Sequence, residues 1–239
     1  MSTPARASAR RARAHVNGIL RPSRHPVAVL VTAAVVVCLL TVLGFLLRSH
    51  PIDQALSQQL NTLHTGWLGW LTDAVYTVIS PVPAVVITGV ITGILWAVSR
   101  QLRVAAAFAG VVAATWIPSD LLKLLVHRPR PDAGLLMHPF SPAQSDPSYP
   151  SGHTVFIATL AIALVFVLRG TRWLPLAAVV GTVVVGGVAV ALSIDAVHYP
   201  TDVVASIVWA LAVAPAVRLI WVDWLIPRIP ILRGPAALS

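Results

Sequence analysis

The middle of the chain contains the run Lys123-Leu-Leu-Val-His-Arg-Pro-Arg-Pro131, followed by Tyr149-Pro-Ser-Gly-His-Thr154 and later by His198-Tyr-Pro-Thr-Asp202. These runs gather cations, three histidines and an aspartate in a sequence that is 57% hydrophobic and only 10% charged. A soluble domain would need far more charge on its surface, so the composition indicates an integral membrane protein. Because charged side chains are costly at membrane depth, the three runs are the first candidates for a functional site.

Six largely apolar segments are long enough to cross a membrane as helices, which predicts an all-α, six-helix integral membrane bundle. We expect these spans near residues 26–47, 81–98, 104–126, 152–168, 173–194 and 201–224. Between the first two spans, residues 48–66 are polar, and Trp67 and Trp70 are typical of anchors at the membrane interface. The stretch from His127 to Pro150 is rich in proline, which forbids a helix over most of its length.

The same pattern predicts the domain organisation. Residues 1–25 form a basic tail, which we expect to be cytoplasmic and disordered, and residues 227–239 form a short C-terminal cytoplasmic tail. Residues 26–226 then make up one membrane domain.

The basic residues are divided unevenly between the two ends of the predicted bundle. Of the 17 Lys and Arg residues, only Arg48, Lys123, Arg128 and Arg130 lie on the side that carries the three runs. The positive-inside rule therefore predicts a plasma-membrane protein with both termini in the cytoplasm and the three runs on the outer face. Since membrane topology accounts for the net charge of +9, we expect no nucleic-acid partner.

The cations and the glycine turn suit a phosphate group. Lys123 and Arg130 lie at a helix end and on the loop after it, and a guanidinium can bind two phosphate oxygens at once. Gly152 lets the backbone approach closely at the predicted start of a helix, where free N–H groups point outward. Ser151 can donate its hydroxyl, or serve only as a helix cap.

Two of the histidines suit phosphoryl transfer. His198 can attack phosphorus if Asp202, one helical turn further on, holds its ring in the right tautomer. His153 can protonate the departing oxygen. Simpler structural roles are open as well: Lys123 can extend to the interface, Asp202 can cap its helix, and Asp120 is placed to pair with Lys123.

Taken together, the three runs resemble the motifs of the type-2 phosphatidic acid phosphatase superfamily, whose members include membrane lipid phosphatases and are related to vanadium haloperoxidases. The first motif, Lys-x6-Arg-Pro, is matched from Lys123 to Pro131, and the second, Pro-Ser-Gly-His, is matched at residues 150–153. The third, Ser-Arg-x5-His-x3-Asp, is matched at His198 and Asp202. The resemblance covers roughly residues 80–217.

This resemblance implies a phosphoric ester or diphosphate hydrolase that needs neither a cofactor nor a metal. His198 would become phosphorylated while His153 protonates the leaving group. Lys123, Arg130, Ser151 and the Gly152 amide would hold the phosphoryl oxygens. The implied substrate is a membrane lipid phosphate or a polyprenyl diphosphate, and the motifs do not distinguish between these.

One position departs from the family pattern. Where the third motif has Ser-Arg, this chain has Ala191 and Leu192, so a phosphate-binding arginine is missing. Losing one such donor typically lowers an enzyme's rate about 100- to 1000-fold. Arg128 is a candidate replacement. The alternative function is a catalytically weakened relative that binds phosphorylated lipid head groups without efficient turnover.

Overall fold

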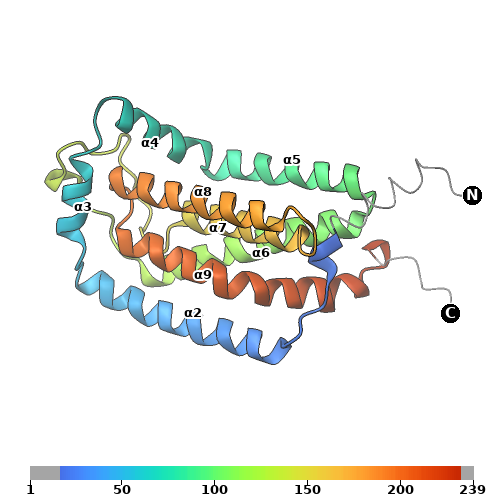
Figure 1. The fold of residues 1–239 in the computed structure, drawn as a ribbon. Coiled ribbons are helices and arrows are strands. Elements are labelled where there is room, and N and C mark those ends of the chain that lie inside the picture. Colours follow the sequence, from blue (N-terminus) through green and yellow to red (C-terminus); the bar gives the residue numbers. More distant parts are fainter. Residues whose placement is uncertain (1–16, 233–239) are drawn as a thin grey trace, which may run out of the picture.

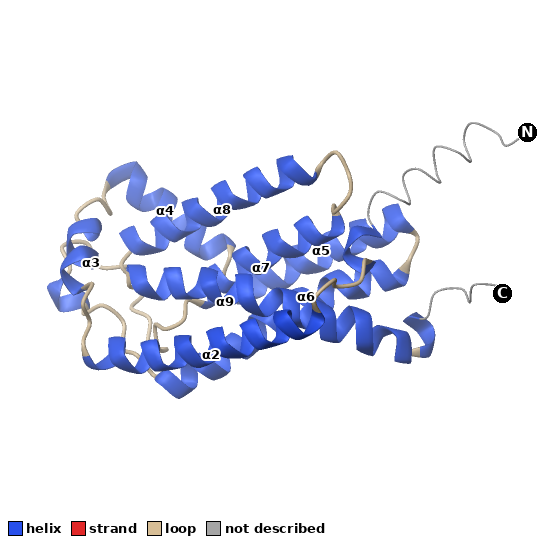
Figure 2. Ribbon diagram, turned by 60° about the horizontal axis from the view of Figure 1, so that its bottom comes forward, coloured by secondary structure: helices blue, strands red, loops and turns tan. Residues whose placement is uncertain are grey.

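The computed structural model describes residues 17–232 as a bundle of α-helices joined by loops and short 3₁₀ or π segments, with no strand among those residues (Figures 1 and 2). The α-helices are α2 (Pro26–Ser49), α3 (Gln54–Asn61), α4 (Gly66–Val78), α5 (Pro81–Ser99), α6 (Leu102–Val126), α7 (Gly152–Val167), α8 (Leu174–Ile194) and α9 (Pro200–Arg218). A π-helix, Leu219–Leu225, continues α9.

The all-α prediction is confirmed, but the predicted number of six helices is wrong for the described residues. Six of the helices coincide with the predicted spans, and α3 and α4 are additional. Both lie between the first two spans and have 8 and 13 residues. A search for membrane spans misses them because a span needs about 20 apolar residues.

Within residues 17–232, five helices are long and apolar enough to cross a membrane: α2, α5, α6, α8 and α9 with its continuation. Helix α7 is also apolar but has only 16 residues. It packs against α6, α8 and α9, so protein rather than lipid surrounds much of it. By contrast, α2 and α5 leave many large apolar side chains exposed, such as Leu39 at 62% and Val85 at 63%. Such apolar outer faces suit contact with lipid.

The helix ends next to the three sequence motifs all lie at one end of the bundle. Helix α6 ends there at Val126, α7 begins there at Gly152, and α9 begins there at Pro200. Short α3 and the loop at 127–150 lie across this end, and the first and last described segments lie at the opposite end (Figure 1). As predicted, the loop contains no α-helix, only the 3₁₀ turn Ala133–Leu135.

The predicted N-terminal tail is packed from Asn17 onward. Asn17–Leu20 forms a 3₁₀ turn whose Ile19 is fully buried in the core. Buried Arg218 donates a hydrogen bond from Nε to the carbonyl of Ile19 at 2.9 Å. The remaining parts of the two predicted tails, residues 1–16 and 233–239, lie outside the described residues.

Candidate active site

Lys123 and Arg130 are held together by one carboxylate, Asp146. The Nζ of Lys123 donates to one carboxylate oxygen of Asp146 at 2.8 Å, and Arg130 donates to the other at 2.8 Å. Burial alone would raise the pKa of Asp146, but the bonds and charges of Lys123 and Arg130 hold it below its usual value. The ion pair predicted between Lys123 and Asp120 is replaced by this one, although Asp120 lies beside the same cavity.

His198 is completely buried beside Arg130, with one ring nitrogen directed toward the guanidinium. Its Nδ1 lies 2.8 Å from the carbonyl of Ser148, which can only accept, so Nδ1 carries the proton. Its Nε2, 3.5 Å from Arg130, is then the nitrogen with a free lone pair. Burial lowers the pKa of His198 well below its ordinary value, and the charges of Arg130 and Lys123 act in the same direction. The ring is therefore neutral at neutral pH, as a nucleophile requires.

His153, in the first turn of α7, faces His198. Their ring centroids are 6.2 Å apart, and the His153 ring also stacks on Tyr76 of α4 with a centroid distance of 4.3 Å. The Nε2 of His153 is buried and has no hydrogen-bond partner among the described residues. A buried ring nitrogen without a partner is costly, which points to a group that binds there.

A cavity of about 400 Å³ between α4, α5, α6, α7 and the loop is lined by Lys123, Arg130, Asp146 and His153. His198 lies beside Arg130 but is fully buried outside this lining. The lining also includes apolar residues, such as Ile79 and Leu124. The cavity thus combines cations that suit an anion with apolar wall residues.

The turn before α7 is fixed by local bonds and by a long-range anchor. Ser151 is fully buried and caps α7, because its hydroxyl oxygen accepts from the backbone N–H of Thr154 at 3.3 Å. Gly152 lies in the cavity wall, where a Cβ would come within 3.6 Å of Asp120. The hydroxyl of Tyr149 donates to the carbonyl of Leu40 in α2 at 2.7 Å, which ties this turn to the first span. The structure therefore places Gly152 at the cavity and shows the hydroxyl of Ser151 in a cap.

Asp202 is near His198 but does not orient its ring by a hydrogen bond. Oδ2 of Asp202 lies 3.9 Å from Nδ1 of His198, and the carbonyl of Ser148 accepts the hydrogen bond from Nδ1 instead. Asp202 accepts from the backbone N–H of Tyr199 at 2.9 Å and from Arg128 at 2.6 Å. Its contacts hold the start of α9, and with it the segment that carries His198.

Arg128 lies outside the cavity lining, in a buried ion-pair network. Its guanidinium donates to Asp202 and, at 2.8 Å, to Asp53 at the start of α3. It also covers the ring of Tyr199 at 3.9 Å. Asp53 in turn accepts from the backbone N–H of Thr201 at 2.9 Å. Arg128 is only 1% exposed, so this arginine joins α3, the loop and α9.

Leu192, at the position where the third motif has arginine, is fully buried in the main hydrophobic core. Four contributors to the site were missed in the sequence: Asp146, Tyr76, Asp53 and the carbonyl of Ser148. Their partners lie far away in the chain, and a backbone carbonyl has no sequence signal at all. Only the charge of Asp146, close to the second motif, could have drawn attention to it.

We predict that Asp146→Asn tightens the binding of phosphate-like anions. An incoming dianion must displace the Asp146 carboxylate from Lys123 and Arg130. The neutral amide of asparagine competes less strongly for these two cations. The dissociation constant of vanadate, measured by thermal shift, should fall about 5- to 10-fold, which is about 1 to 1.4 kcal/mol. Asp132→Asn, the same change in an exposed loop residue, is the control. Unchanged or weaker vanadate binding in Asp146→Asn would contradict the prediction.

Comparison with known proteins bears on the family and the fold of this chain. The model of the PAP2 superfamily matches residues 102–225. The chain is 31% identical over 118 residues to an undecaprenyl-diphosphatase, BcrC, of Bacillus subtilis; the match covers 48% of this chain and 57% of that protein. The fold resembles the crystal structure of a transmembrane PAP2-type phosphatidylglycerolphosphate phosphatase from Bacillus subtilis, with a TM-score of 0.65 and 15% identity over 83% of this chain and 97% of that one. The names of both proteins are those of phosphatases, the enzyme class that the sequence predicted.

Proposed function

Because the chain belongs to the PAP2 superfamily, whose model matches residues 102–225, we propose that it hydrolyses a phosphate or diphosphate ester of a membrane lipid. In this proposal the reaction takes place at the outer face of the membrane and proceeds through a phosphohistidine at His198. The observation that carries it is the pairing of His198, whose Nε2 faces the Arg130 guanidinium at 3.5 Å, with His153, whose Nε2 has no hydrogen-bond partner among residues 17–232.

The first step transfers the phosphoryl group to the protein. Once the phosphate of the substrate offsets the charges of Lys123 and Arg130, His153 holds a proton. Nε2 of His198 attacks phosphorus, and the bond between phosphorus and the leaving oxygen breaks while His153 gives that oxygen its proton. Lys123 and Arg130 exchange Asp146 for the phosphoryl oxygens, and the N–H groups at the start of α7 contribute further donors near Gly152.

The second step releases inorganic phosphate. A water molecule attacks the phosphohistidine, its proton passes to His153, and the bond between phosphorus and Nε2 of His198 breaks. Both rings thereby return to their starting state. The hydrogen bond from Nδ1 of His198 to the carbonyl of Ser148 keeps Nε2 directed at phosphorus in both steps.

The walls of the cavity and the relatives support this substrate class. The undecaprenyl-diphosphatase and the phosphatidylglycerolphosphate phosphatase are named for lipid-linked substrates. In this chain Leu124 and Pro81 line the cavity, and Leu121 and Val82 beside them are 69% and 76% exposed on the bundle surface. A lipid tail can lie along this apolar surface while its phosphate reaches the cations.

The proposal is tested by phosphate release from purified protein in liposomes. The panel comprises a polyprenyl diphosphate, phosphatidylglycerol phosphate and phosphatidic acid, with p-nitrophenyl phosphate as a soluble comparison. We expect turnover of at least one lipid that is faster than turnover of the soluble ester. Vanadate binding without turnover of any lipid would contradict hydrolysis and favour the head-group-binding alternative that Leu192 suggested.

The proposed outer location is tested separately by labelling. Cys38 is the only cysteine in the sequence, so Leu135→Cys in a Cys38→Ala background places one thiol on the exposed loop. A maleimide that cannot cross membranes should label this variant in intact cells. Labelling only after the cells are opened would place the site on the cytoplasmic side.

A further inference from the structure

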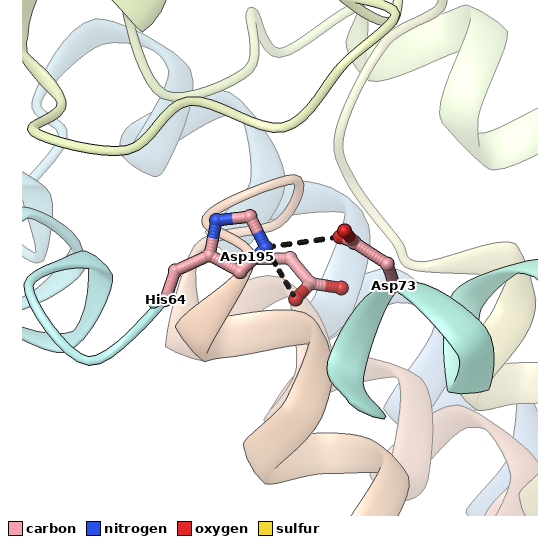
Figure 3. Close-up of side chains that lie close together, drawn as sticks. All are labelled: His64, Asp73 and Asp195. Atoms are coloured by element: carbon pink, nitrogen blue, oxygen red, sulfur yellow. Dashed lines mark hydrogen bonds and ion pairs between the residues drawn. The ribbon is translucent and has the colours of Figure 1, made fainter. Parts of the chain in front are cut away.

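A second polar cluster lies outside the candidate active site. His64 lies between α3 and α4, Asp73 on α4, and Asp195 directly after α8, and the three side chains converge (Figure 3). The Nε2 of His64 is 2.9 Å from a carboxylate oxygen of Asp73 and 3.7 Å from one of Asp195. One ligand atom from each residue lies within 4.8 Å of the others.

The two ring nitrogens of His64 both face oxygen acceptors. Its Nδ1 is 2.7 Å from the carbonyl of His138, which only accepts, so Nδ1 carries the proton in the neutral ring. Nε2 then directs a lone pair at two carboxylates. Three electron-rich groups facing one another require a positive charge between them, supplied by a proton on Nε2 or by a metal ion.

The burial of Asp195 indicates that the cluster is a binding site rather than a chance grouping of surface charges. Its side chain is 0% exposed, and neither carboxylate oxygen has a hydrogen-bond partner among the described residues. The hydroxyl of Thr72 lies close to it, but that proton goes to the carbonyl of Gly69 at 3.0 Å. A buried carboxylate without a hydrogen bond is costly unless a cation compensates it.

A buried residue, Asn61, holds the surroundings of His64 in place. Its amide nitrogen donates to the carbonyl of His138 at 2.9 Å and to that of Ile194 at 3.3 Å. Its amide oxygen accepts from the backbone N–H of His138 at 2.8 Å. The carbonyl that fixes the tautomer of His64 is thus itself fixed, as around histidines that bind metals.

We propose that His64, Asp73 and Asp195 bind one divalent transition-metal ion, for which Zn²⁺ is the best fit. One imidazole nitrogen and two carboxylates are ligands of borderline softness, unlike the all-oxygen sets that Mg²⁺ and Ca²⁺ prefer. Ligand atoms bound tetrahedrally to Zn²⁺ at about 2.0–2.2 Å lie about 3.3–3.6 Å apart. The widest pair of ligand atoms must therefore approach by up to about 1.5 Å, while the 2.9 Å pair of His64 and Asp73 must open slightly. The side chain of Asp73 is 47% exposed, which gives the ion a path from solvent.

The ion would be structural rather than catalytic. It joins α4 to the end of α8, three residues before His198, and α4 also carries Tyr76, which stacks on His153. Metal binding at this place would fix two supports of the active site without touching the substrate. The inference is therefore independent of which ester the protein hydrolyses, and its test does not rely on activity.

The test uses full-length protein purified without a histidine tag and treated with a chelator. After incubation with Zn²⁺ and removal of free ion, elemental analysis should find about one Zn²⁺ per chain. At about 100 times the dissociation constant, Zn²⁺ should raise the Tm by about 5 °C or more. Mg²⁺ at the same concentration should have little effect.

Two conservative variants and a matched control make the result specific. Asp195→Asn and Asp73→Asn should each weaken Zn²⁺ binding at least about 100-fold. Asp132→Asn, the same change outside the cluster, should bind Zn²⁺ like the unchanged protein. Since Asp73 is half exposed, its variant is expected to fold even if the Asp195 variant does not.

Two outcomes would overturn the proposal. One is that the unchanged protein retains no Zn²⁺ and its Tm does not respond, which would leave a proton on His64 as the compensating charge. The other is that Asp73→Asn folds and binds Zn²⁺ as tightly as the control.

Discussion

His198→Gln is expected to lower lipid phosphatase activity at least about 1000-fold, because it removes the only group proposed to form a bond to phosphorus. Glutamine is close in size and can still donate to the carbonyl of Ser148, so the buried site keeps a polar partner. The measurement is phosphate release from whichever lipid the unchanged protein hydrolyses fastest, with the Tm of the variant compared in parallel.

The control and the trapped intermediate make this prediction specific. His50→Gln changes an exposed histidine at the end of α2 and should leave activity unchanged. When the unchanged protein is denatured during turnover under basic conditions, a phosphorylated peptide containing His198 should be found, and it should be absent from the variant. Activity of His198→Gln within about tenfold of the unchanged protein would rule out nucleophilic attack by this residue.

Arg128→Met is expected to give the largest loss of stability, about 3–5 kcal/mol, since it leaves two carboxylates without their cation. Asp202 is fully buried and Asp53 is 6% exposed, so water cannot replace the guanidinium. In a chain of this size such a loss lowers the Tm by on the order of 10 °C. Thermal unfolding in detergent, followed by tryptophan fluorescence, measures it.

Two further variants test the reason for this loss. Adding Asp53→Asn to Arg128→Met removes one of the two uncompensated charges and should recover part of the Tm. Arg48→Met removes an exposed arginine that donates to the carbonyl of Val126, and it should cost no more than about 1 kcal/mol. A Tm of Arg128→Met equal to that of Arg48→Met would show that the buried network contributes little.

The spans could be predicted because the membrane imposes a simple rule on sequence. A helix in lipid must satisfy its own backbone and present apolar side chains for about 20 residues, so α2, α5, α6 and α8 were found almost to the residue. Helices α3 and α4 obey no such rule. They are short, and packing at one end of the bundle decides their conformation.

The residues of the candidate active site divide in the same way. Lys123, Arg130, His153 and His198 stand in local motifs, and their chemistry alone indicates phosphate. Their partners come from elsewhere in the chain, because Arg128 meets Asp53 and the ring of His198 is oriented by a backbone carbonyl. A single sequence contains no mark of such long-range pairs, so the role of Arg128 as a structural cation could not be foreseen.

The sequence by itself determined that the protein is an all-α membrane bundle and which side chains are candidates for binding phosphate. Both follow from properties that each residue has on its own, its transfer free energy and its functional group. Only the tertiary structure decided that Asp146 neutralises two cations and that His64 meets Asp195, because charges interact strongly at a few ångströms and the fold alone sets those distances.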